Sequence, residues 1–185
     1  MSTARRVLVL AALIVVGSLT AHAQKRAGVM GDLIADVTDV ESKIVGLAKA
    51  LPDGAYAWRP MPGVRSVGEV VTHVAADNYF MPIALGAGAP AGTGISGTDY
   101  KTVEAYEKKT RTRAEIIAEV EKSFAFLKQQ MNDTTDGKLE TSMKIFGRDS
   151  AVRTTWVGTV THLHEHLGQL IAYARSNKVV PPWSK

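Results

Sequence analysis

The sequence contains no cysteine in its 185 residues. Disulfide bonds are therefore excluded, and so is a lipid attached to a cysteine at a cleavage site. Thiolate ligation is excluded as well. If the chain binds a transition metal, histidine, aspartate and glutamate are the side chains that must hold it.

Neither sign of charge dominates the chain. Lysine and arginine together number 22, against 18 aspartates and glutamates, which gives a formal net charge of +4. Two of the cations, Arg5 and Arg6, lie in a segment that we expect to be removed, and without them the charge falls to about +2. A charge this small gives no support for binding to nucleic acid or to an anionic membrane surface.

The one long apolar run is at the N-terminus. Two arginines precede the uncharged stretch VLVLAALIVVGSLTAHA, which ends in the small-x-small pattern AHA. This order is typical of a secretory signal peptide, so we expect residues 1–23 to be cleaved and residues 24–185 to form one mature domain. The run is shorter than the ~20 apolar residues of a spanning helix, which favours cleavage over a retained membrane anchor. The expected location is therefore periplasmic or extracellular, without stable membrane insertion after cleavage.

Apolar residues recur at three- and four-residue spacing in four segments, which predicts four amphipathic helices. Two of the helices begin with capping boxes, in which serine or threonine is followed three residues later by glutamate. The boxes are Ser66 with Glu69 and Thr112 with Glu115. The predicted helices span about 29–51, from 66 to the glycine-rich stretch, from 112 to about 131, and 152–177.

The connections carry the remaining local signals. The stretch GAGAPAGTGISG, residues 86–97, predicts a loop that is free to move over whatever it covers. Ile145-Phe146-Gly147 is interpreted as a short extended piece. Four long helices with little strand signal favour an all-α fold of the helix-bundle type.

The segment THLHEHLGQLIAYAR places three histidines within five residues of the last helix. His162 and His166 are four residues apart, so they share one face of the helix and can chelate one transition metal. His164 lies on another side and is expected to take no part. A third ligand must come from another helix. The candidate is His73, with Asp77 one turn further along, because His22 belongs to the signal peptide.

Two other interpretations of these histidines start from the same segment. The letters HEHLG invite comparison with the zinc-protease pattern HExxH, but Gly168 stands where the second histidine is required. Protease chemistry of that type is excluded. Spacing alone also leaves open that His162 and His166 are ordinary helix residues, partly exposed or satisfied in the interior, because HxxxH is common on helices.

A family resemblance adds to this interpretation. HLHEHLGQLIAYAR resembles the closing motif of the DinB-like proteins, in which a histidine is followed by three residues and then H-x-G-Q. WRPMPGVRSVGEVVTHVAADN resembles the segment around their first ligand, where W-x-P and a capped helix lead to a histidine. The resemblance covers nearly all of the mature chain. It implies an up-down four-helix bundle of the DinB/YfiT type, with one zinc or nickel ion held by His73, His162 and His166.

Some members of this family are thiol-dependent transferases or isomerases, and many have no assigned activity. Leu167 stands at a position that is often arginine in the family, so any charge contact made there is missing. The low-molecular-weight thiols that such relatives use are cytoplasmic, so the expected export argues against that activity. The resemblance also makes a homodimer plausible.

Three hypotheses about function follow. The first is an exported metal-dependent hydrolase or transferase acting on a small molecule, with Asp77 as the preferred acceptor or base. Glu165 is a weaker candidate for that role, while Gln169 and Tyr173 are positioned to support the site or to bind a ligand. The second hypothesis is a non-catalytic metal- or ligand-binding protein of the cell envelope. The third is a purely structural bundle.

Overall fold

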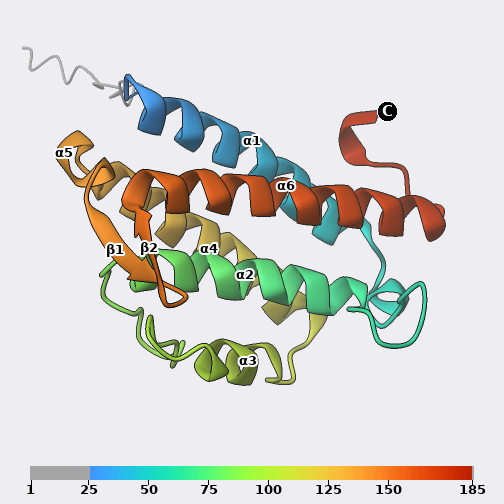
Figure 1. The fold of residues 1–185 in the computed structure, drawn as a ribbon. Coiled ribbons are helices and arrows are strands. Elements are labelled where there is room, and N and C mark those ends of the chain that lie inside the picture. Colours follow the sequence, from blue (N-terminus) through green and yellow to red (C-terminus); the bar gives the residue numbers. More distant parts are fainter. Residues whose placement is uncertain (1–25, 185) are drawn as a thin grey trace, which may run out of the picture.

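Four long α-helices occupy the segments where the apolar periodicity predicts them (Figure 1). The structure is a computed structural model that describes residues 26–184, so the predicted signal peptide, residues 1–23, lies outside the described residues. Within the described residues no helix is both long and apolar enough to cross a membrane. The long helices are α1 (Val29–Ala50), α2 (Val67–Ala84), α4 (Arg113–Asp133) and α6 (Val152–Ser176).

Both predicted capping boxes form, and they set the starts of α2 and α4. The Ser66 side chain accepts a hydrogen bond from the backbone N–H of Glu69, whose carboxylate accepts one from the Ser66 N–H at 2.7 Å. Thr112 and Glu115 make the same reciprocal pair, with the Thr112 N–H donating at 2.6 Å. Each box satisfies backbone donors that a helix start leaves without partners.

The long helices pack on one another around a single large apolar core. Helix α2 packs against α4 and α6, and α1 packs against the same two helices on the other side. Every long helix contributes side chains that are fully buried, which is the packing that the apolar stripes in the sequence predict. Members of this core include Val37, Ile44, Val70, Val74, Phe124, Leu127, Trp156 and Leu163.

Helix α2 is buried on its outer side as well. The glycine-rich loop and a short helix that the periodicity analysis does not predict, α3 (Lys101–Glu107), cover that side with a second apolar cluster. Gly97 lies so close to α2 that a Cβ would come within 2.7 Å of the Ile83 carbonyl oxygen. The loop is therefore packed against α2. The cluster contains Ala76, Tyr79, Phe80, Ile95, Val103 and Tyr106.

A two-stranded hairpin leads into α6 and lies beside the end of α2 (Figure 1). It follows the short helix α5 (Asp136–Leu139) and consists of β1 (Ser142–Ile145) and β2 (Arg148–Ala151). The interpretation of residues 145–147 as extended is wrong beyond Ile145. Phe146 and Gly147 form the turn, with φ of 51° and 76°, because a type I′ hairpin turn requires positive φ at both central residues. The 3₁₀ helices are η1 (Asp53–Ala55) and η2 (Pro182–Ser184).

Candidate metal centre

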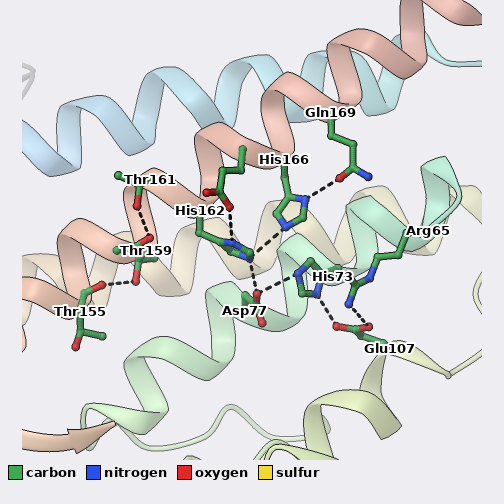
Figure 2. Close-up of polar contacts among 12 residues, drawn as sticks. Arg65, His73, Asp77, Glu107, Thr155, Thr159, Thr161, His162, His166 and Gln169 are labelled. Carbon is green, nitrogen blue, oxygen red and sulfur yellow. Dashed lines mark hydrogen bonds and ion pairs between the residues drawn. The ribbon is translucent and has the colours of Figure 1, made fainter. Parts of the chain in front are cut away.

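His73 of α2 and His162 and His166 of α6 converge in the space between the two helices (Figure 2). One ring nitrogen from each lies within 4.8 Å of the others. The ring centroid of His73 is 5.4 Å from that of His162 and 4.7 Å from that of His166. The three histidines that the sequence singles out are therefore placed to hold a metal ion.

His73 is buried and is oriented by a carboxylate from outside α2. Its Nδ1 lies 2.6 Å from Oε1 of Glu107, the last residue of α3, and Arg65 contacts the other oxygen of that carboxylate at 3.3 Å. Burial raises the pKa of Glu107, but the hydrogen bond and charge of His73, with Arg65, lower it below the ordinary value overall. The ionised carboxylate accepts the Nδ1 proton of His73 and leaves its Nε2 free to bind a metal.

His166 is oriented by a relay of polar side chains on its own helix. Its Nδ1 lies 2.9 Å from Oε1 of Gln169, and the Gln169 amide donates to the Tyr173 hydroxyl at 3.0 Å. Tyr173 in turn donates to the backbone carbonyl of Arg65 at 3.1 Å. Burial lowers the pKa of His166 to about 4, so the ring is neutral at pH 7, as a metal ligand must be.

His162 contacts carboxylates on both sides of its ring. Nε2 lies 2.8 Å from Oδ2 of Asp77, and Nδ1 lies 3.4 Å from the exposed Glu165 carboxylate. The hydrogen bond with Asp77 is the main reason that the pKa of His162 is raised. Nε2 of His162 also lies 3.1 Å from Nε2 of His166. Two ring nitrogens and a carboxylate oxygen thus meet at one point, where either a proton or a cation can hold them together.

Asp77 is the only carboxylate within the described residues that contacts two of these histidines. Its Oδ2 lies 2.8 Å from Nε2 of His162 and 3.3 Å from Nε2 of His73, and the residue is only 6% exposed. Its other oxygen, Oδ1, is buried without a hydrogen-bond partner in the described chain. A buried acceptor of this kind needs a cation, a donor or a proton to compensate its lost hydration.

The donor set fits a divalent transition metal. Each of these three histidines has a side-chain oxygen near its Nδ1. The tautomer protonated at Nδ1 would direct the Nε2 lone pairs to the shared point, which is the arrangement of metal-bound imidazoles. Nitrogen ligands at ~2.1 Å from a tetrahedral ion lie about 3.4 Å apart, which is close to the Nε2 separation of His162 and His166. The spacing of these nitrogens is therefore compatible with metal coordination, and imidazole ligands do not by themselves select one transition metal.

A cavity of about 680 Å³ opens beside the histidines. Its walls come from α2, from α6 and from the hairpin turn, with Tyr100 at one side. His73, Asp77 and His162 form its polar end, while Met81 and Phe146 belong to its apolar part. Among the described residues, the glycine-rich segment 86–97 does not line this cavity, so Tyr100, just beyond it, is the nearest loop residue that does.

The remaining residues that the sequence analysis names fall outside the cavity. His164 is half-exposed and contacts Asp36 of α1 at 2.9 Å, away from the other histidines, as expected. Glu165 has an exposed side chain. Gln169 contacts His166, and Tyr173 contacts the backbone carbonyl of Arg65. These two side chains are therefore placed to orient His166.

The sequence analysis misses Glu107 and Arg65. Glu107 ends α3, and the apolar spacing of Val103 and Tyr106 is the only local signal for that helix. Nothing in the spacing of Glu107 relative to His73, 34 residues away, indicates that they meet. Their contact depends on α3 folding back over α2.

Comparison with known proteins identifies the family. The family model of the DinB superfamily matches residues 36–170. The chain belongs to the DinB superfamily. No curated protein matches the chain.

Two crystal structures of DinB-like proteins share the fold. One, from Bacillus cereus, is 19% identical with a TM-score of 0.63 and covers 83% of this chain and 95% of its own. The other, from Bacillus subtilis, is 16% identical with a TM-score of 0.62 and covers 80% of this chain and 93% of its own. At such identities the likeness shows the DinB fold alone.

Proposed function

We propose that this DinB-superfamily protein binds one zinc or nickel ion through His73, His162 and His166 and acts as a metal-dependent hydrolase or transferase on a small molecule. The observation that carries the proposal is the orientation of the rings. Each Nδ1 faces an acceptor, and each Nε2 faces a shared point beside a cavity of about 680 Å³. Three neutral nitrogen ligands leave at least one position on the metal for water or substrate.

The chemistry divides between the ion and the protein. A divalent ion held at this point supplies Lewis acidity toward a water molecule or a substrate oxygen. Asp77 supplies the base, because its Oδ1 has no partner in the described chain and its Oδ2 lies 2.8 Å from Nε2 of His162, next to the point where the ion would be held. Glu107 and Gln169 keep the Nδ1 protons of His73 and His166 in place, so that those rings stay fixed while a proton moves at Asp77.

A second candidate function is non-catalytic binding of a metal or ligand. The same Asp77 contacts favour it, because Oδ2 lies within 3.3 Å of two of the ring nitrogens and can itself be a fourth ligand. A site closed by three histidines and one carboxylate is of the structural kind and leaves no position for substrate. The role of Asp77 therefore separates the two functions.

We also propose a location, a helix topology and an assembly for the protein. The apolar N-terminal stretch supports export to the periplasm or the extracellular space by a signal peptide at residues 1–23. The contacts of α2 with α4 and α6, and of α1 with the same helices, support an up-down four-helix bundle. The substrate is a small molecule, and a homodimer is the proposed assembly.

Elemental analysis of protein purified without an affinity tag tests the metal site. We expect about one zinc or nickel ion per chain, at least tenfold less in His166→Ala, and an unchanged content in His164→Ala. His164 is the matched control, because it lies on the same helix and its ring contacts the half-exposed Asp36, away from the other three histidines. Wild-type protein that remains metal-free after incubation with either metal, or His166→Ala that retains it, would refute the site.

The Asp77→Asn variant then separates the two functions. If the site is catalytic, this variant keeps the metal and loses turnover, because the amide cannot accept the proton. If Asp77 is a ligand, metal affinity falls in the same variant. Turnover that survives complete metal removal contradicts both versions of the proposal.

A further inference from the structure

Phe146 occupies a position that folding alone does not explain. It is 62% exposed and has a positive φ of 51°, in the first of the two turn positions of the hairpin. Asparagine followed by glycine is the favoured pair for such a turn, and a bulky aromatic residue with positive φ is an outlier. A strained, exposed aromatic residue at the edge of a cavity indicates a function.

Phe146 is part of an aromatic cluster on the cavity wall. Its ring centroid lies 5.5 Å from that of Phe80 and 6.1 Å from that of Tyr100, and Phe80 and Tyr100 are 5.5 Å apart. Tyr100 is also exposed, at 40%. Phe146 and Tyr100 both line the cavity. Aromatic side chains arranged in this way favour another aromatic ring.

The rim of the cavity carries one cation without a carboxylate partner in the described chain. Arg148 and Asp149 both line the cavity, and Asp149 is paired with Lys144 at 3.2 Å. Arg148 makes no ion pair within residues 26–184 and is exposed at the start of β2. A guanidinium beside an apolar wall is a good receptor for a carboxylate, which it can bind with two parallel hydrogen bonds.

The α6 side of the cavity has room and an unused hydroxyl. Gly158 lines the cavity, and a Cβ added there would meet nothing within 4 Å. Thr155, only 8% exposed, also lines it, and its Oγ1 is buried without a hydrogen-bond partner in the described chain. Along the same face, Thr159 and His162 lead from Thr155 toward the metal centre (Figure 2).

We propose that the cavity binds a small aromatic carboxylic acid. The ring of the acid packs against Phe146 and Tyr100, and its carboxylate pairs with Arg148. Thr155 donates a hydrogen bond to a polar group of the bound acid. A volume of about 680 Å³ suits a molecule of one to three rings. As a statement about the substrate class this rests on the proposed function, because only the metal makes the bound acid a substrate.

The test compares two probes of the same shape. Binding of 2-naphthoate and of its neutral amide, 2-naphthamide, is measured by calorimetry on metal-loaded wild-type protein. We expect the acid to bind about tenfold more tightly than the amide, which corresponds to one charge-assisted hydrogen-bonded pair. Equal affinity for the two probes, or no binding of either, overturns the proposal.

Three variants assign the contacts. Arg148→Gln is expected to remove the preference for the acid, whereas Arg153→Gln, an exposed arginine outside the cavity, keeps it. Gly158→Leu fills part of the cavity and is expected to weaken the binding of both probes at least tenfold. The control is Gly137→Leu in α5, which is expected to leave the binding of both probes unchanged. Phe146→Asn is expected to weaken the binding of both probes. It also creates the Asn-Gly pair that a type I′ turn favours, so the hairpin is not destabilised.

Metal content is measured in every variant. The acid is expected to bind His166→Ala as well, because the ring and carboxylate contacts do not involve that residue. Failure of metal binding alone therefore refutes the proposed function and leaves the acid site standing. A different result would be naphthoate binding that requires the metal and is unchanged in Arg148→Gln. The carboxylate would then bind the metal directly, and the proposed pairing with Arg148 would be wrong.

Discussion

Single residues that contact Nδ1 of the histidines determine the tautomer of each ring, and therefore whether its Nε2 can bind a metal. Glu107 contacts Nδ1 of His73 at 2.6 Å and is itself contacted by Arg65. A carboxylate in that position selects the tautomer whose Nε2 is unprotonated and makes that nitrogen more basic. An amide keeps the size of the carboxylate but loses its charge, so it supports the imidazole less well.

We therefore predict that Glu107→Gln lowers the affinity for zinc by about 10- to 100-fold without unfolding the protein. Competition with a chelating dye measures the affinity, and circular dichroism checks the fold. Glu104→Gln is the control, since Glu104 lies on the exposed side of the same helix and pairs only with Lys108. Equal affinities in the two variants would show that Glu107 has no part in metal binding.

Residues also show the limit of pattern analysis. His162 and His166 are predictable as a pair because a helix places residues four apart on one face, whatever surrounds it. Asp77 is predictable as a neighbour of His73 for the same reason. Glu107 is not, because 34 residues separate it from His73 and only the packing of α3 on α2 brings them together.

At the scale of elements, the capping boxes link helix stability to pH. Glu69 and Glu115 have lowered pKa values, chiefly because each carboxylate accepts a hydrogen bond from the backbone of its capping residue. A carboxylate whose pKa is lower in the folded state stabilises the fold above its unfolded value of about 4.5. That stability is lost as the pH falls through the lower, folded pKa.

We predict that Glu69→Gln combined with Glu115→Gln makes stability less dependent on pH between 7 and 3. Glutamine can still close a capping box but does not titrate, so the acid-sensitive part of the stability disappears. Urea unfolding midpoints across this range measure the effect. Glu104→Gln combined with Glu140→Gln serves as the control, because these two glutamates form surface ion pairs and take no part in a capping box. A double variant as acid-sensitive as the wild type would contradict the assignment.

Helices and strands also differ in how readily they can be predicted from their sequences. The long helices are found from apolar spacing because each buries one face in the main core. Helix α3 and the hairpin are too short for such a pattern, and the turn at Phe146 breaks the usual rules for turn residues. The interpretation of residues 145–147 as extended is wrong at Phe146 and Gly147 for that reason.

At the scale of the whole molecule, the candidate metal centre would link two helices that the core already holds together. Its ligands come from α2 and α6, which also contact each other through the apolar core. Because the core is separate from the histidines, we expect the fold to survive without metal. A bound ion adds stability that rises with the logarithm of its concentration relative to its dissociation constant.

We predict that zinc or nickel at one hundred times its dissociation constant stabilises the protein by about 2.7 kcal/mol. For a domain of this size, the melting temperature then rises by about 5–11 °C. Calorimetry with and without a chelator measures the shift, and far-ultraviolet circular dichroism should show equal helix content in both states. His166→Ala should lose the shift and His164→Ala should keep it. An unchanged melting temperature in wild-type protein would favour a purely structural bundle.

The sequence by itself determined the long helices, their capping boxes and the histidine pair on α6, because these depend on residues close together in the chain. Together with the family resemblance, it also indicated His73 as the third ligand. Only the tertiary structure decided which groups stand behind and beside those ligands. The contact of Glu107 with His73, the two-sided contact of Asp77 and the aromatic wall at Phe146 arise where distant segments pack. Such contacts follow from burial of the faces of α2, which local periodicity does not encode.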